Sequence, residues 1–429
     1  MAERVVRWAV VGGGVAGCVV AARLSERQDH DVLLLEAGPD HGPEHAPADV
    51  GPLVTDPSRL RVEHVVRRPG GVPEPYWQGL GLGGSSLVNG SIVVPDPDSA
   101  GQPTELLPME EPWADGPVGA ALLATDPAAA RVRLARSART RVTVADAYLR
   151  PVLDRTNLAV RTGAEVRAVR FDGRRAAGVE LTSGEIVQAD RVVLCAGAIR
   201  TPTILLRSGV DTPGVGEGLQ DHPAFTITLA LLPDAIDPTV PTIAVAAVHD
   251  DHQVLALNHL PGSPNLGALT VGLLRVRSNG RLTLPDPDGE PLVELAQLSD
   301  PADAAALCRA VGDTLDRLGD PVWATVADAA FVDAAGTPTA AIAGSPVRIA
   351  AWVPEHLGGH HHVAGTCADG VVTDGGVVRR YDDLYVCDAS VFRGVPARNP
   401  YLSVIALAER TVRAWTGASS WHDEAEPGS

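Results

Sequence analysis

A glycine-rich turn near the start of the chain constrains its fold more than any other feature. Val10 and Val11 are apolar and β-branched, as residues of a buried parallel strand usually are. Gly12, Gly14 and Gly17 follow in the spacing G-x-G-x-x-G. The first glycine permits the tight turn, the second lets a pyrophosphate approach the backbone, and the third lets a helix lie close to the strand. The spacing therefore predicts a strand, a turn and a helix that together bind a phosphate.

The residues after the turn complete this unit. A helix is expected from about Val15 to Ser25, with its free N–H groups facing the phosphates. A second buried strand is expected at Val32–Leu35, and Glu36 ends it about 20 residues after the last glycine, where a carboxylate accepts hydrogen bonds from a ribose. Together these elements predict a dinucleotide site. A tight turn in some other βαβ sheet is the alternative.

The charge of the chain limits its partners. The net charge of −18 disfavours nucleic acid and anionic membrane surfaces. All the basic residues are arginines, so lysine chemistry such as Schiff-base formation is excluded. The length of 429 residues leaves room for two domains with separate cores.

The five cysteines show no C-x-x-C spacing and no paired framework, which is typical of a reducing compartment. The first strand begins within the first ten residues, which leaves no room for a signal peptide, and no apolar run is long enough for a membrane span. We therefore expect a cytoplasmic protein.

A glycine- and serine-rich segment, Tyr76–Ser91, reads YWQGLGLGGSSLVNGS. By composition alone it is either a flexible linker or a loop that wraps a ligand. Its run GLGLGGSSLVN resembles the first signature of the glucose–methanol–choline (GMC) oxidoreductases, FAD enzymes that oxidise alcohols. SLVNG is particularly similar to the bacterial cholesterol-oxidase-like branch. The resemblance implies that Gly84, Ser85 and Asn89 lie along the isoalloxazine ring and the pyrophosphate of FAD.

A second resemblance lies in the run RVVLCAGAIRTPTILLRSG, residues Arg191–Gly209. An apolar strand is expected at Val192–Leu194, and a helix from Pro202, because proline suits the first helical turn. The run resembles the second GMC signature, which favours FAD over NAD as the cofactor. In relatives, the backbone of the position that matches Val166 contacts adenine.

A third resemblance covers Gly358–Trp415. The pattern predicts a buried strand at 384–387, a turn at 388–390 and an apolar helix at 403–415. In the family, the turn that matches Asp388 and Ala389 lies beside the ribityl chain and the pyrophosphate.

His356, His360, His361 and His362 raise the question of a metal site. Neighbouring residues of a strand face opposite ways, so three adjacent histidines do not all reach one ion. No carboxylate or cysteine lies at a matching spacing, and we expect no metal.

The family resemblance gives these residues another role. His362 falls where GMC enzymes carry their catalytic histidine, and Asn399 falls where the cholesterol-oxidase-like branch carries its active-site asparagine, followed by Pro400 and Tyr401 at the cofactor. A histidine suits the base that removes a hydroxyl proton while hydride leaves carbon for flavin N5. A core histidine at position 362 is the alternative, and His222 is expected to be structural.

The sequence thus predicts an α/β fold (α+β overall), with a Rossmann-like FAD-binding domain and a second, antiparallel-sheet substrate domain. The expected boundaries are 1–91, 135–223 and 356–429 for the discontinuous FAD-binding domain, 92–134 for a trimmed connecting segment, and 224–355 for the substrate domain.

The predicted function is the FAD-dependent oxidation of a small-molecule alcohol to a carbonyl, with oxygen, a quinone or a redox carrier as the electron acceptor. A redox-silent lyase of the same fold, or a non-catalytic remnant of the family, remains an alternative. Some GMC relatives attach the flavin to a histidine five residues before the paired glycines of the first signature. Gln78 stands at that position, so we expect FAD to be held without a covalent bond, which favours a dehydrogenase over a strong oxidase.

Overall fold

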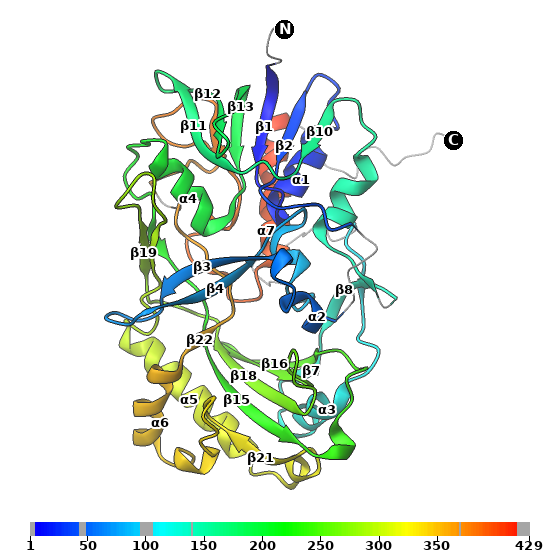
Figure 1. Ribbon diagram of the computed structural model, residues 1–429. Coiled ribbons are helices and arrows are strands. Elements are labelled where there is room, and N and C mark those ends of the chain that lie inside the picture. The colour runs from blue at the N-terminus through cyan, green and yellow to red at the C-terminus, as the bar shows by residue number, and fades with distance from the viewer. Residues whose placement is uncertain (1–4, 43–48, 95–105, 139, 369, 418–429) are drawn as a thin grey trace.

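The computed structural model describes residues 5–42, 49–94, 106–138, 140–368 and 370–417. Two large β-sheets lie at opposite ends of the molecule, and a smaller sheet lies between them (Figure 1).

The first sheet has the topology of a nucleotide-binding fold. Its strands are β1 (Val6–Val11), β2 (Val32–Leu35), β10 (Leu158–Arg161), β11 (Val166–Asp172), β12 (Arg175–Leu181), β13 (Ile186–Leu194) and β23 (Leu384–Val386). Strands β10, β2, β1 and β13 are adjacent and parallel, and β23 lies parallel to the end of β13. The hairpin of β11 and β12 extends the sheet with antiparallel strands. The expected Rossmann-like unit is confirmed.

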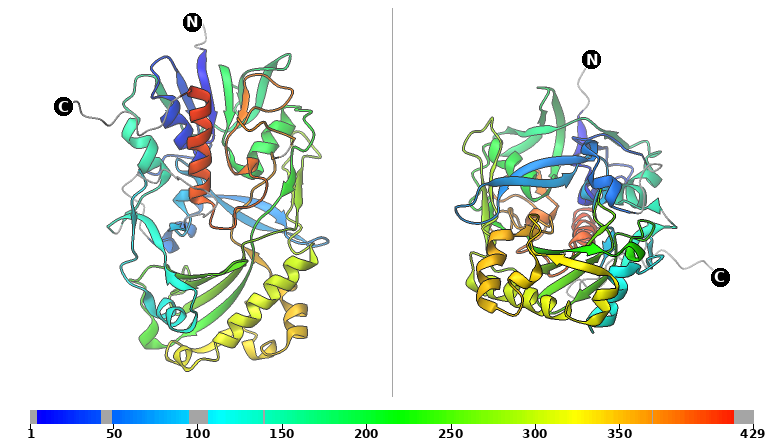
Figure 2. Two further views of the ribbon diagram at one scale, coloured as in Figure 1. Left: turned by 180° about the vertical axis from the view of Figure 1, so that it is seen from behind. Right: turned by 60° about the horizontal axis from the view of Figure 1, so that its bottom comes forward.

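Helices cover both faces of this sheet because its strands are apolar on both sides. Helix α1 (Val15–Leu24) and helix α7 (Tyr401–Thr416) pack against each other in one core (Figure 2). Trp8 of β1 stacks on Trp415 of α7, with 5.7 Å between the ring centroids. The C-terminal helix therefore returns to the nucleotide-binding unit, as its apolar pattern predicts.

Helix α4 (Gly197–Arg207) lies on the opposite face and begins earlier than predicted. Pro202 lies inside this helix, where it has no N–H to donate to the carbonyl of Ala198. The hydroxyl of Thr366 donates to that carbonyl instead, over 2.7 Å. The predicted start at Pro202 was wrong because a distant side chain replaces the missing helical hydrogen bond.

The second sheet is antiparallel throughout, which confirms the expected architecture of this part of the chain. In spatial order it contains β21 (Ala327–Phe331), β15 (Pro223–Leu231), β18 (Leu266–Leu273), β17 (His252–Leu257), β16 (Ile243–Val248) and β7 (Ala129–Arg131), with β22 (Gly358–Gly359) beside β15. Helices α3 (Gly116–Thr125), α5 (Pro301–Arg317) and α6 (Pro346–Trp352) accompany it (Figure 2).

The side chains of this sheet alternate between two faces, as successive residues of a strand do. Phe225, Ile227 and Leu229 of β15 enter a core shared with α3 and α5. Thr226, between the first two, lines a cavity on the other face. The sequence predicts one solvated face for this sheet, and that face forms the wall of the cavity.

The third sheet joins distant parts of the chain. Its order is β14 (Glu217–Leu219), β19 (Gly280–Thr283), β20 (Leu292–Glu294), β3 (Leu60–Val66) and β4 (Pro73–Gly79). The sequence predicts an antiparallel sheet for 224–355, a range that includes β19 and β20, and for these two strands the prediction was wrong. The backbone of β19 pairs with β14 and β20 instead, and β20 pairs with β3.

The segment 92–134, predicted as a trimmed connection, contains α3 and several short strands, while its residues 95–105 lie outside the described residues. These strands are β5 (Ile92–Val93), β6 (Met109–Glu110) and β7, and β8 (Arg133–Ser137) and β9 (Thr140–Arg141) follow them. A short helix, α2 (Gly51–Val54), precedes β3 in the chain. Since β3 pairs with β20 across the predicted boundary, the division into domains stays a prediction. In the described part of the chain, no helix combines the length and the apolar character that crossing a bilayer requires.

The contact between Thr366 and α4 can be tested by replacing the buried threonine with valine. Thr366→Val leaves the Ala198 carbonyl buried without a donor, so the free energy of unfolding should fall by about 1–3 kcal/mol, measured by urea denaturation. Thr314→Val is the matched control, because the buried Thr314 hydroxyl donates to the Ala310 carbonyl of α5, which keeps its helical N–H donor. Equal losses in the two variants would contradict this account of α4.

Candidate active site

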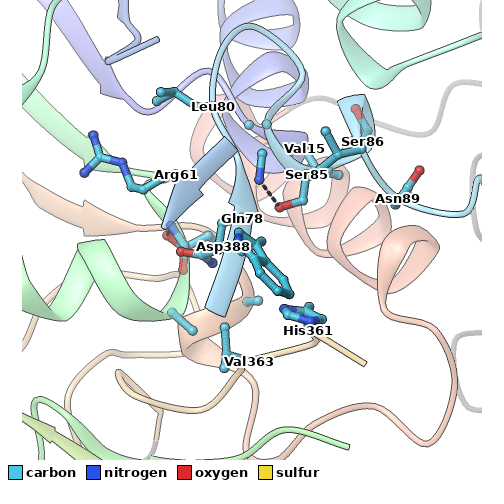
Figure 3. Close-up of a pocket in the computed structure, with 18 of the residues that line it drawn as sticks. Val15, Arg61, Gln78, Leu80, Ser85, Ser86, Asn89, His361, Val363 and Asp388 are labelled. Atoms are coloured by element: carbon cyan, nitrogen blue, oxygen red, sulfur yellow. Dashed lines mark hydrogen bonds between the residues drawn. The ribbon is translucent and has the colours of Figure 1, made fainter. Parts of the chain in front are cut away.

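Each of the three sheets described above contributes to the lining of a cavity of about 720 Å³. Figure 3 shows that Ser85 and Asn89, Asp388, and His361 reach it from different segments of the chain. The predicted site residues that line it are Gly12, Gly14, Glu36, Gly84, Ser85, Asn89, Val166, His362, Asp388, Ala389, Asn399, Pro400 and Tyr401.

Gly17 is the predicted site residue that does not line the cavity, and its position has a packing reason. A Cβ atom on Gly17 would lie 1.8 Å from the carbonyl oxygen of Gly12, so only glycine lets α1 lie this close to the turn. The backbone of Gly12 has φ +97°, a left-handed conformation that glycine adopts without strain. Gly14 caps the N-terminus of α1 and faces the cavity, and the first turn of α1 carries no acidic residue.

Glu36 ties three loops together at the edge of the first sheet. Its Oε2 accepts the N–H of Gly13 over 2.6 Å, and its Oε1 accepts those of Gly38 and Gly81 over 2.8 and 3.2 Å. Burial raises the pKa of this carboxyl, and the three N–H groups oppose the rise. A carboxylate has about four acceptor positions, so a position remains for a ribose hydroxyl.

The glycine–serine loop meets the first glycine turn directly. A Cβ atom on Gly84 would lie 2.6 Å from the Cα of Gly14, so the two backbones touch with no side chain between them. Ser85 Oγ accepts the N–H of Gly79 over 3.2 Å (Figure 3). Arg141 donates to Asn89 Oδ1 over 2.6 Å, which leaves the Nδ2 donor of Asn89 for a ligand.

The side chain of Asp388 holds the turn after β23 in place. Asp388 accepts the Thr201 hydroxyl over 2.6 Å and the backbone N–H groups of Gly197 and Ser390 over 2.9 and 2.8 Å. Because these contacts join the turn to the start of α4, they fix Ala389 at the cavity.

The adjacent histidines separate into two directions. His361 has φ +61° and turns its ring to Tyr76, 4.4 Å away between centroids. The rings of His360 and His362 lie on the other side, beside His222, with centroid distances to His222 of 6.2 and 5.2 Å. Within the described ranges, no group of histidine, cysteine and acidic side chains has an arrangement that would hold a metal ion.

His222 and His362 share a hydrogen bond. Their Nδ1 atoms are 3.0 Å apart, and Nε2 of His222 lies 3.0 Å from the carbonyl oxygen of Pro396. One oxygen of the buried Asp221 accepts the backbone N–H groups of both histidines, over 2.8 Å for His222 and 2.7 Å for His362. Both rings are therefore oriented by backbone and side-chain contacts together.

Burial keeps these histidines uncharged. It lowers the pKa of His222 to about 3 and the pKa values of His360 and His361 to about 4. Burial, and then the neighbouring histidines, hold the pKa of His362 well below its usual range. Burial also raises the pKa of Asp221 to about 6.

The sequence placed His362 and Asn399 in one site, and the structure brings both to the same cavity. It did not identify Asp221, and it assigned His222 only a structural role. The adjacent acid and histidine in the run GVGEGLQDHP are the signal that could have identified this pair.

The lining fits a dinucleotide by its donors and by its unpaired atoms. The N-terminus of α1 is a favourable place for a phosphate, because its first N–H groups have no helical partner. Asn399 Oδ1 and His361 Nδ1 are buried and lack a hydrogen-bond partner within the described part of the chain. A ligand in the cavity would satisfy these buried polar atoms.

Comparisons with known proteins give a consistent result. A family model described as GMC oxidoreductase matches residues 128–224 with its N-terminal part and 276–408 with its C-terminal part, together more than half of the chain. A model for an NAD(P)-binding Rossmann-like domain matches residues 10–58.

Two relatives align with most of the chain. An uncharacterized GMC-type oxidoreductase of Rhodococcus erythropolis is 28% identical over 94% of this chain and 96% of its own length. An oxygen-dependent choline dehydrogenase of Chromohalobacter salexigens is 26% identical over 94% of this chain and 93% of its own length.

Solved structures share the fold. A pyridoxine 4-oxidase from Mesorbium loti has a TM-score of 0.85 and 23% identity, covering 97% of this chain and 100% of that chain. A variant of the formate oxidase of Aspergillus oryzae has a TM-score of 0.82 and 16% identity, with the same coverage.

The similarity of SLVNG to the cholesterol-oxidase-like branch stays a prediction. The chain belongs to the GMC oxidoreductase family.

Proposed function

We propose that this protein is an FAD-dependent oxidoreductase that oxidises the CH–OH group of an uncharged alcohol to a carbonyl, with His362 as the base. The observation that carries the proposal is a neutral histidine at the cavity wall, held through Nδ1, in the same cavity as the unpaired amide oxygen of Asn399. Family membership supports the reaction class.

The cofactor would be held mainly by backbone groups. The N-terminus of α1 and the two touching glycine turns suit the pyrophosphate, Glu36 suits the ribose, and Val166 suits the adenine. Ser85, Asn89, Asp388, Ala389, Pro400 and Tyr401 complete the set of proposed FAD contacts. When bound, FAD supplies the redox chemistry by accepting hydride from the alcohol carbon.

His362 acts on the hydroxyl proton. Because its pKa is depressed by burial, the ring is unprotonated at neutral pH and has a lone pair to accept that proton. A weak base suffices here, since the hydroxyl proton becomes far more acidic as electrons leave the carbon. Asn399 orients the hydroxyl with its amide group and carries no charge.

The second sheet indicates the substrate class. Its contribution to the cavity wall consists of three aliphatic and two hydroxyl side chains, Ile243, Leu255, Leu257, Thr226 and Thr270. None of these five is a carboxylate or an aromatic ring, the groups that recognise a quaternary ammonium. The proposed substrate is therefore an uncharged alcohol with an apolar body, in contrast to choline.

The proposal extends to the location and the electron acceptor. Four of the five cysteines are buried and all are unpaired, which favours a reducing, cytoplasmic location. The electron acceptor is oxygen, a quinone or a redox carrier.

The base is tested by anaerobic reduction of the bound flavin. Apolar primary and secondary alcohols should bleach the flavin of the wild-type protein, and choline should not. His362→Ala should keep its FAD and slow the bleaching by about 10²–10⁴-fold, the usual contribution of a positioned base. Asn399→Ala should also slow it, and His361→Ala should slow it far less.

Three outcomes would overturn the proposal. Equal losses in the His360→Ala, His361→Ala and His362→Ala variants would remove the special role of His362. Release of a carbonyl compound from a cyanohydrin without bleaching would indicate the lyase alternative. A folded, flavin-loaded protein that no alcohol bleaches would favour the non-catalytic alternative.

FAD should be bound without a covalent link, because Gln78 lines the cavity and offers no nucleophile for the flavin. Denaturation in acid followed by centrifugation should leave all the yellow colour in the supernatant. Flavin that stays with the pellet would show that another side chain is attached to it.

The neutral histidines predict a loss of stability in acid. His360 keeps its neutral form down to its pKa of about 4, whereas an unfolded histidine takes up a proton near pH 6.5. Between these values the unfolded chain binds more protons, so the free energy of unfolding falls as the pH falls. Asp221 acts in the opposite direction, because its raised pKa of about 6 gives the folded state the extra proton.

His360→Gln should make this pH slope shallower by up to about 1.4 kcal/mol per pH unit, measured by urea unfolding at pH 7, 6 and 5. His64→Gln, on the exposed face of β3, is the control for replacing a histidine whose side chain is not buried. A wild-type slope in His360→Gln would show that His360 titrates as an unfolded histidine does.

A further inference from the structure

A chain of two hydrogen bonds runs from a backbone carbonyl to the proposed base. It begins at the carbonyl oxygen of Pro396, passes through the imidazole of His222, and ends at Nδ1 of His362, with both donor–acceptor distances at 3.0 Å. His222 has no exposed surface, so water does not compete for either bond.

The Pro396 carbonyl fixes which ring nitrogens of His222 and His362 carry the protons. A carbonyl oxygen only accepts, so Nε2 of His222 carries a proton and donates it to Pro396. A neutral imidazole has one N–H, which leaves Nδ1 of His222 as a bare acceptor. The bond between the two Nδ1 atoms then requires that His362 be the donor.

The two other arrangements of protons on His222 are disfavoured. If His222 carried its proton on Nδ1, its bare Nε2 would face the Pro396 carbonyl at 3.0 Å, two acceptors against each other. If His222 carried both protons, it would be a buried cation. Burial and the adjacent His360 lower its pKa to about 3, although the carbonyls of Pro396 and Leu274 oppose that shift.

The backbone around both rings is fixed independently of their protons. Asp221 Oδ1 accepts the N–H of both residues, so one carboxylate oxygen sets the spacing between the two backbones. Asp221 Oδ2 accepts the hydroxyl of the buried Tyr76 over 3.3 Å. The two rings therefore meet edge to face, with 88° between their planes.

We infer that His222 is a positioning residue, which holds His362 in the tautomer with the proton on Nδ1 and the lone pair on Nε2, toward the cavity. His362 lines the cavity, and within the part of the chain that the structure describes its ring is hydrogen-bonded through Nδ1. The consequence for catalysis rests on the proposed function, since a base needs its lone pair where the substrate hydroxyl lies. The tautomer itself does not depend on that function.

The tautomer is read directly by nitrogen NMR. A protonated and a bare imidazole nitrogen differ widely in ¹⁵N chemical shift, so histidine-labelled holoprotein gives the state of each ring, with His362→Gln identifying the His362 signals. The expected result is a protonated Nδ1 and a bare Nε2 for His362, and the reverse for His222. A protonated Nε2 on His362 in the resting holoprotein overturns the inference.

Two substitutions at His222 separate the effect of losing the hydrogen-bond acceptor from the effect of losing the ring. His222→Asn keeps an acceptor, the oxygen bonded to Cγ, at the position of Nδ1, whereas His222→Leu removes it. His222→Leu should shift the His362 signals toward the other tautomer. It should also slow flavin reduction, at most by the factor of about 10²–10⁴ that a positioned base contributes. The alcohol concentration needed for half-saturation should not rise to match. His222→Asn should keep the wild-type tautomer and most of the rate.

The outcomes distinguish this inference from the proposed function. Equal rate losses in His222→Leu and His222→Asn, or an unchanged tautomer in His222→Leu, would overturn it. If no alcohol reduces the wild-type flavin, the proposed function fails, while the nitrogen shifts still decide the tautomer. If His222→Leu does not fold, the wild-type shifts and the His222→Asn variant decide it.

Discussion

The hydrogen bonds to Glu36 are the interaction on which the nucleotide end of the molecule depends. One buried carboxylate joins the first glycine turn, the end of β2 and the glycine–serine loop through the N–H groups of Gly13, Gly38 and Gly81. Burial of this charge is costly, and the three backbone donors offset that cost. Because the loops are held together here, Gly84 touches Gly14 and both backbones line the cavity. A side chain at Gly84 would separate them, because its Cβ atom would lie 2.6 Å from the Cα of Gly14.

The other end of the cavity depends on how the side chains of the second sheet alternate between its two faces. Its core-facing residues pack on α3 and α5, so the residues between them, such as Thr226 and Thr270, must face the cavity. Against this uncharged wall stand histidines that burial keeps neutral. The charged side chains of the lining, including Arg61 and Asp388, come from segments outside this sheet. One cavity thus combines a charged half suited to a dinucleotide with a neutral half suited to an alcohol.

Much of the fold was predictable because the signals are local. The G-x-G-x-x-G spacing requires a specific turn, and the apolar runs around it predict β1, α1 and β2 close to their observed bounds. The antiparallel strands β15 to β18 and helix α5 follow from short-range periodicity in the same way. Where an element depends on a distant partner, local pattern failed. The hydroxyl of Thr366 lets α4 start before Pro202, and β19 pairs outside the sheet that its pattern suggested.

The sequence by itself determined which residues could carry the chemistry, because histidine, asparagine, glutamate and glycine in these spacings restrict what a site can do. The tertiary structure alone decided how they act. Residues 140 positions apart form the His222–His362 hydrogen bond, and its direction follows from the Pro396 carbonyl, which lies in a third segment. The protonation state of a ring is set by desolvation and by the partner of its other nitrogen, and both are properties of the folded surroundings rather than of residue order.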